Sequence, residues 1–285
     1  MNRSEEITYE LCKKSFLSLW SFANPLRGDG KELCDILVMF DPHLVIFSVK
    51  EIQYAWNVDE AVALKRWERR AIDRSARQIY NAQSWITQNR AILTSEKKPI
   101  SIPDLGRAKI HRVAVALGSK GKVSVGLSAS NGRGYIHVYD EVTIHRTLRE
   151  LDTITDFVEY LTAVESLLMR GTKVTLIGGQ DDLLALYLQN NRSFTDKFDM
   201  LVVDEGTWER FESRQEVKWR KEEDQISYVW DGIIEKFSQD VQEGTLEYES
   251  TLGETELVLR TMAGENRFNR RLLSQQIDDM LRTTP

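Results

Sequence analysis

Cysteine is scarce in this chain: Cys12 and Cys34 are the only two among 285 residues. This argues against a disulfide framework or a cysteine zinc site and suits a reducing cytoplasm, where we expect the protein to act. The four histidines lack metal-ligand spacing, so we assign them no role. No apolar run reaches bilayer-spanning length, and the polar first ten residues do not resemble a signal peptide. We therefore expect no membrane partner.

Glycine-rich phosphate-binding motifs are also missing. The stretch from Gly118 to Gly134 contains no Gly-Lys-Ser/Thr ending, which excludes a P-loop there. The doublet Gly178-Gly179 is explained by a tight turn between a strand and a helix. The acidic pair Asp204-Glu205 suits the start of a helix, where carboxylates are favoured.

The net charge of −6 argues against a protein that coats nucleic acid, but the charge is distributed unevenly. Residues 1–58 carry a net −2, residues 59–122 a net +8, and residues 123–285 a net −12. Locally basic surface attracts phosphate backbones whatever the total charge. The central segment could therefore bind nucleic acid, although solvated charges on a helix surface are the more common explanation of such a cluster.

The most informative stretch is residues 30–50, which reads as a β-hairpin. Two apolar segments flank the turn Asp41-Pro42-His43, and their continuous hydrophobicity predicts strands that are covered on both faces. Pairing of Asp41 with Leu44 would place Asp35 opposite Lys50. Because side chains alternate along a strand, Asp35, Ser48 and Lys50 would then share one face.

The remaining periodicity predicts an α/β protein whose C-terminal half is largely helical. Residues 60–89 form the most basic expected helix, with an inward stripe that includes Glu60, Ser75 and Gln78 and with five arginines on its flanks. Those arginines are Arg66, Arg69, Arg70, Arg74 and Arg77. The other elements expected are helices at 5–20, 142–151, 153–170, 181–190, 207–240 and 254–283, and strands at 110–117, 135–139, 174–177 and 200–203.

An aspartate and a lysine at the open end of an apolar hairpin provide the minimum for metal-assisted phosphodiester cleavage. This order of strand, turn, strand ending in x-Lys, and basic helix resembles the PD-(D/E)xK nuclease superfamily. The runs Gly30-Lys-Glu-Leu-Cys-Asp35, Phe47-Ser-Val-Lys50 and Leu151-Asp-Thr-Ile-Thr-Asp-Phe157 also resemble a group of uncharacterised bacterial proteins. The first resemblance implies a restriction-endonuclease-like mixed sheet flanked by helices. It further implies Mg²⁺ or Mn²⁺, catalytic Asp35 and Lys50, and cleavage of DNA more than RNA, in phage defence or restriction.

One position departs from the superfamily, because Ser48 stands where an acid normally precedes the lysine by two residues. Some restriction enzymes with Ser-x-Lys recruit the missing carboxylate from the following helix. The resemblance therefore makes Glu60 the first candidate and Glu68 the second. Further candidates are Glu32, which could swing in from the Gly30 loop, and Glu10; Glu51 should point to the opposite face. Gln78 matches a polar residue that the superfamily often has on this helix.

Three functions remain open. In the first, the chain is a nuclease with core residues 1–120 and a mainly helical region 121–285. Alternatively, Ser48 marks a catalytically inactive nuclease fold that binds nucleic acid or a protein partner. In the third, the acidic C-terminal half docks a protein partner or a second copy of the chain, and the polar residues of the hairpin are incidental.

Overall fold

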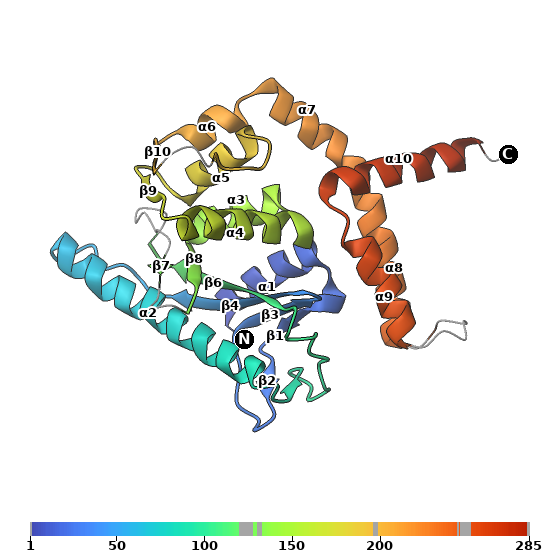
Figure 1. Cartoon of the computed structure of the whole chain (residues 1–285), viewed down its shortest axis with the longest axis horizontal. Helices are drawn as coiled ribbons and strands as arrows, with labels where there is room; N and C mark the ends of the chain where they lie inside the picture. Colours follow the sequence, from blue (N-terminus) through green and yellow to red (C-terminus); the bar gives the residue numbers. More distant parts are fainter. Residues whose placement is uncertain are drawn as a thin grey trace.

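The strand β4 (His43–Glu51) lies in the middle of a six-stranded mixed sheet, in the order β1-β3-β4-β6-β8-β7 (Figure 1). The computed structural model describes residues 2–119, 128–129, 133–195, 199–243, 245 and 252–283. β4 pairs antiparallel with β3 and parallel with β6, which is itself parallel to β8. The other strands of this sheet are β1 (Ser21–Ala23), β3 (Ile36–Phe40), β6 (Lys109–Leu117), β7 (Ser128–Ala129) and β8 (Tyr135–Tyr139).

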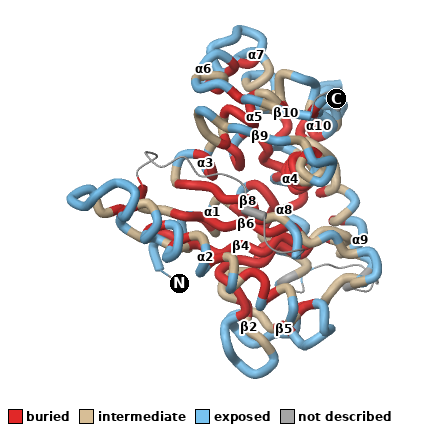
Figure 2. Tube along the Cα trace, turned by 60° about the vertical axis from the view of Figure 1, so that its left-hand side comes forward, coloured by how far each residue is buried: buried red, intermediate tan, exposed pale blue. Residues whose placement is uncertain are grey.

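Helices cover both faces of this sheet, so its central strands are buried on both sides (Figure 2). One face packs against α2 (Glu60–Thr87), and the opposite face packs against α1 (Arg3–Phe16), α3 (Glu141–Glu150) and α4 (Ile154–Met169). All five residues of β3 are buried, as are six consecutive residues of β4. This arrangement confirms the prediction, from their continuous hydrophobicity, of strands covered on both faces.

The hairpin is present, but its register differs from the prediction by two residues. Ile36 pairs with Phe47, which places the preceding Asp35 beside Ser48 instead of Lys50. The turn consists of Asp41 and Pro42, joined by a cis peptide bond, and His43 already belongs to β4. Because side chains alternate, a shift of two residues keeps Asp35, Ser48 and Lys50 on one face, as predicted. That face is the one covered by α2.

The helix α2 begins after Asp59, whose carboxylate accepts a hydrogen bond from the backbone N–H of Val62. Its buried stripe includes Trp67, Ala71, Ser75 and Ala82, in agreement with the predicted inward face. The hydroxyl of Ser75 bonds to the carbonyl oxygen of Ala71 within the helix, so Ser75 has a structural partner and does not reach the hairpin. The first turns of α2 project past the edge of the sheet (Figure 1).

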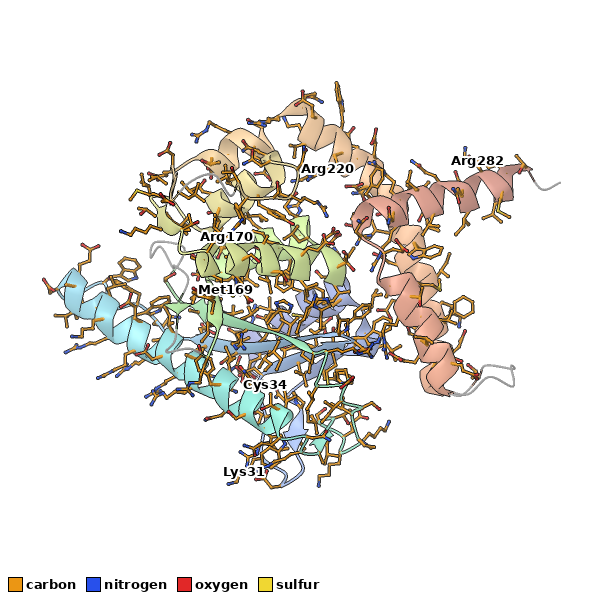
Figure 3. The ribbon with its side chains drawn as sticks, in the orientation of Figure 1. Lys31, Cys34, Met169, Arg170, Arg220 and Arg282 are labelled. Atoms are coloured by element: carbon orange, nitrogen blue, oxygen red, sulfur yellow. The ribbon has the colours of Figure 1, made fainter. Side chains whose placement is uncertain are left out.

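The C-terminal half is largely helical, but the two long helices expected there are interrupted. The segment 207–240 forms three α-helices separated by residues 213–214 and by a 3₁₀ turn, and 254–283 breaks between Gly264 and Asn266. Asn266 accepts a hydrogen bond from the Asn269 N–H, which begins a new helix there. The helices are α5 (Gln180–Gln189), α6 (Thr207–Glu212), α7 (Gln215–Glu223), α8 (Tyr228–Glu243), α9 (Leu252–Ala263) and α10 (Arg267–Thr283). Arg282, labelled in Figure 3, lies near the end of α10, which extends away from the body.

The sheet extends past residue 120, where we expected the first domain to end. β8 hydrogen-bonds to β6, and α4 contributes to the same core as α1. Two short pairs lie outside the main sheet: β9 (Lys173–Leu176) with β10 (Met200–Val203), and β2 (Leu26–Arg27) with β5 (Ile92–Leu93). The segment from Gly118 to Gly134, in which the sequence analysis excludes a P-loop, lies largely outside the described residues. No helix in the described part of the chain has both the length and the apolar character needed to cross a bilayer.

Candidate active site

Asp35 lies at the floor of the candidate site, with 1% of its surface exposed. Its Oδ2 accepts hydrogen bonds from the Val49 backbone N–H at 2.5 Å and the Ser48 hydroxyl at 3.3 Å. Lys50 Nζ lies 3.0 Å from the same oxygen, and the Gln78 side-chain amide donates to Oδ1 at 2.8 Å. Burial of a carboxylate is costly unless it is paired, and these four donors supply that pairing.

Ser48 and Gln78 complete a connected network around this carboxylate. The Ser48 hydroxyl also lies 2.8 Å from Gln78 Oε1, so the position that normally carries an acid hydrogen-bonds to both Asp35 and Gln78. Ser48 is fully buried, whereas the Lys50 side chain keeps 28% of its surface exposed. Lys50 therefore lies between the buried carboxylate of Asp35 and the solvent. The predicted convergence of Asp35, Lys50 and Gln78 is confirmed.

Glu32 joins the site from the loop that precedes β3. Its carboxylate is 3.4 Å from the Gln78 amide nitrogen. Desolvation, the negative charge of Asp35 and a hydrogen bond to Asp35 raise the pKa of Glu32, and Lys50 partly opposes that rise. The structure therefore places two carboxylates together, one buried and one at the surface. Lys31, labelled in Figure 3, lies in the same loop, on the side of the molecule away from the C-terminal helices.

The other predicted acids do not reach Asp35. The prediction that Glu60 supplies the missing carboxylate is wrong. Glu60 begins α2, eighteen residues before Gln78, and so lies about 27 Å from it along the helix axis. Its exposed side chain is at the projecting end of α2, and Glu68 is also exposed. Glu10 pairs with Lys13 at 2.7 Å. Glu51 points to the opposite face, as predicted, where it accepts a hydrogen bond from Ser4.

The sequence analysis missed Glu5, on the first turn of α1. Its charge contributes to the raised pKa of Glu32, so the acid of α1 that acts on the site is Glu5, five residues before the predicted Glu10. Glu5 also hydrogen-bonds to Asn2, where it completes a capping box. The acids at positions 5, 6 and 10 indicate that the first helix could bring a carboxylate to the site. Which of them lies near Glu32 depends on how α1 packs on the sheet.

Four of the five predicted arginines form a stripe on one flank of α2. Arg66, Arg70, Arg74 and Arg77 follow one another at spacings of four, four and three residues, and Gln78 continues this flank into the site. All four are exposed, and none of their guanidinium groups lies within 4 Å of a carboxylate in the described residues. Arg77 bonds only to the Asp73 backbone oxygen. These four arginines therefore form no ion pair with Glu68 or Asp73 in this part of the chain.

Arg69 is displaced around the helix from the line that these four arginines form. It lies one residue before Arg70, and one residue corresponds to about 100° around a helix. It is also exposed, so it is a natural control for the stripe.

A metal cation at this site would have few protein ligands. Among the described residues, no group of three or more His, Cys, Asp or Glu side chains converges as in a closed metal site. The carboxylates of Asp35 and Glu32 are the donors available. No family model, curated protein or solved structure matches the chain.

Proposed function

We propose that the protein is a metal-dependent nuclease that cleaves phosphodiester bonds of DNA, with Asp35, Glu32, Lys50 and Gln78 as its active-site residues. One observation carries the proposal: a loop, a strand and a helix that are distant in sequence bring two carboxylates, a lysine and a glutamine to one partly open point. A buried ionic network at the end of an otherwise apolar hairpin contributes little to stability compared with apolar packing. Its presence is better explained by chemistry.

The order of the elements supports the same proposal. A helix, a strand pair, a second helix and a parallel strand follow one another as α1, β3, β4, α2 and β6. This is the order that the resemblance to the PD-(D/E)xK superfamily implies for a restriction-endonuclease-like core. Fold order alone does not establish activity, so the proposal depends on the site.

The donor set fits Mg²⁺ or Mn²⁺ better than a metal that needs a closed cage. Mg²⁺ is commonly held by one or two carboxylates together with waters and substrate phosphates. Asp35 and Glu32 provide two carboxylates whose mutual repulsion a divalent cation would relieve. Such an ion, when bound, neutralises charge on the phosphate and lowers the pKa of water.

The chain's own residues have separable roles in this proposal. Lys50 carries the positive charge that faces both the carboxylate and solvent, so it can stabilise negative charge that develops on a phosphate. Gln78 donates to Asp35 and fixes the orientation of that carboxylate. The arginine stripe on α2 leads to Gln78 and can position the backbone of a nucleic acid without reading its bases.

A second function is favoured by a different observation. Asp35 is already contacted by the Val49 N–H, Lys50 and Gln78, and the position that normally carries an acid is a buried serine whose proton is shared between Gln78 and Asp35. These features would suit a fold that binds nucleic acid through the arginine stripe and no longer cuts it. The two proposals make different predictions for metal binding and for cleavage.

The deciding experiment incubates the full chain with supercoiled plasmid, linear duplex, single-stranded DNA and RNA, in Mg²⁺, Mn²⁺ or EDTA. We expect metal-dependent cleavage of DNA that Asp35→Asn and Lys50→Ala abolish. The matched control is Glu51→Gln, a neighbouring acid on the opposite face, which should cleave like wild type. Salt-sensitive DNA binding without cleavage in either metal would support the second function, and absence of both would refute both.

A further inference from the structure

The opposite face of the sheet carries a second polar cluster, formed by three histidines from three parallel strands. His43 Nδ1 of β4 lies 3.1 Å from His111 Nε2 of β6. His111 Nδ1 is 3.9 Å from Glu165 Oε1 of α4, and His137 Nε2 of β8 is 3.1 Å from the same oxygen. His111 and His137 are almost completely buried. Buried polar groups generally find hydrogen-bond partners, and this chain connects the buried imidazoles to the partly exposed His43.

The protonation of the chain follows from its surroundings. Burial, reinforced by nearby positive charge, lowers the pKa of His43 to about 4 and that of His111 to about 3, so both imidazoles are neutral near pH 7. His111 Nδ1 has no hydrogen-bond partner among the described residues and lies 3.9 Å from Glu165 Oε1, so the carboxylate charge favours a proton on this nitrogen over a lone pair. His111 Nε2 therefore accepts the hydrogen bond from His43 Nδ1–H, and His43 Nε2 keeps a free lone pair.

His43 lines a cavity of about 450 Å³ between the start of the parallel strands and the helices α4 and α5. Lys109, paired with His43 across the two strands, lines the same cavity, and its ammonium has no carboxylate within 4 Å in the described residues. Arg192 supplies a second cation, which remains partly exposed although it pairs with the buried Asp156. Because Asp156 already compensates the charge of Arg192, Lys109 is the cation that suits an anion in this cavity.

The other walls suit a larger molecule than a bare anion. Glu159 lines the cavity, and desolvation and the charge of Asp156 raise its pKa, which Arg192 partly opposes. The Glu159 carboxylate and the His43 imidazole line the same cavity and can accept hydrogen bonds from hydroxyl groups. Val158, Ala163 and the ring of Tyr187 form an apolar wall. The volume lies within the usual range for small-molecule sites.

We propose that this cavity binds a nucleoside monophosphate. Its phosphate would face Lys109, its ribose hydroxyls would donate to His43 Nε2 and Glu159, and its base would lie against the apolar wall. No part of this proposal depends on nuclease activity, because the site is on the other face of the sheet. His43 and Lys50 occupy opposite ends of β4.

The test is isothermal titration of the full chain with AMP, GMP, CMP and UMP, and with inorganic phosphate and the nucleosides as half-ligands. We expect saturable binding of at least one nucleotide below about 1 mM, and binding of each half-ligand at least about tenfold weaker. Lys109→Ala should weaken nucleotide binding about tenfold, because a charged hydrogen bond is lost. His43→Gln should weaken it as well, and Lys173→Ala, an exposed lysine elsewhere, should leave it unchanged.

Two further variants identify where a nucleotide binds. Asp35→Asn and the double variant Arg70→Ala/Arg74→Ala should bind nucleotides as wild type does, even if both lose nuclease activity or DNA binding. The proposal is overturned if no nucleotide binds, if Lys109→Ala and His43→Gln bind normally, or if the variants on the α2 face abolish binding.

Discussion

Replacing Asp35 by alanine tests the candidate site most directly, because the structure gives the cost of losing that carboxylate. The buried N–H of Val49 and the amide of Gln78 lose their acceptor, and an unsatisfied buried donor costs roughly 1–3 kcal/mol. Lys50 is partly exposed and can be hydrated again, and the repulsion between Asp35 and Glu32 disappears. We therefore expect Asp35→Ala to lower the free energy of unfolding by about 2–4 kcal/mol.

The assay is urea denaturation followed by circular dichroism, with and without MgCl₂ or MnCl₂. A cation that binds only the folded wild type adds about 1.4 kcal/mol at ten times its dissociation constant. Asp35→Ala should lose this increment, and Glu51→Gln should keep it. The reasoning is refuted if Asp35→Ala is as stable as wild type, since the four hydrogen bonds to Asp35 would then have no energetic weight. If neither metal stabilises wild type, the metal-dependent function fails while the structural account of Asp35 stands.

Three further outcomes follow from other contacts. The pKa of Glu32 is higher in the folded state than in the unfolded state, so ionisation of Glu32 disfavours the folded state. Its contribution to stability therefore falls as pH rises from the unfolded-state pKa to the folded-state pKa. Glu32→Gln should flatten this dependence in urea melts at pH 4–7 and should reduce metal binding and cleavage. Arg70→Ala/Arg74→Ala should reduce the slope of log affinity against log salt by up to about two units in DNA-binding titrations, and Arg69→Ala should contribute far less. Arg267 is buried between Asp152 and Asp231. In urea melts, Arg267→Ala should lower the free energy of unfolding by about 3–5 kcal/mol. Arg282→Ala, at an exposed ion pair, should lower it by less than about 1 kcal/mol.

Much of the fold could be predicted because strong periodicity and local caps agree with tertiary packing. The buried faces of β3, β4 and α2 follow from their hydrophobic patterns, and Asp59 caps α2. The short strands β1, β2 and β5 could not be predicted, because two or three residues show no usable alternation. The helix breaks at Gly264 and in the segment 213–214 depend on local caps that periodicity does not register.

The errors at the candidate site have two separate geometric causes. Sequence alternation correctly assigns Asp35, Ser48 and Lys50 to one face, but it cannot choose between registers that differ by two residues. Helical periodicity likewise assigns a residue to a face without fixing how far along the axis the partner strand crosses. Glu60 and Gln78 share the predicted inward stripe, yet the rise per residue separates them by about 27 Å. Gln78 crosses β4 at its open end, so the nearby acid is Glu32.

The histidines illustrate what a linear reading cannot recover. We assigned them no role because positions 43, 111 and 137 show no local spacing, and the parallel register of the sheet brings these three imidazoles together. His43 pairs with Lys109 and Val45 with His111, so His43 and His111 lie two residues apart in register and on the same face. Val113 pairs with His137, which adds the third imidazole one strand further along that face. Parallel pairing thus aligns His43 with His111 across a connection of more than fifty residues that contains α2. Chemistry that depends on such pairing becomes visible only once the order of the strands is known.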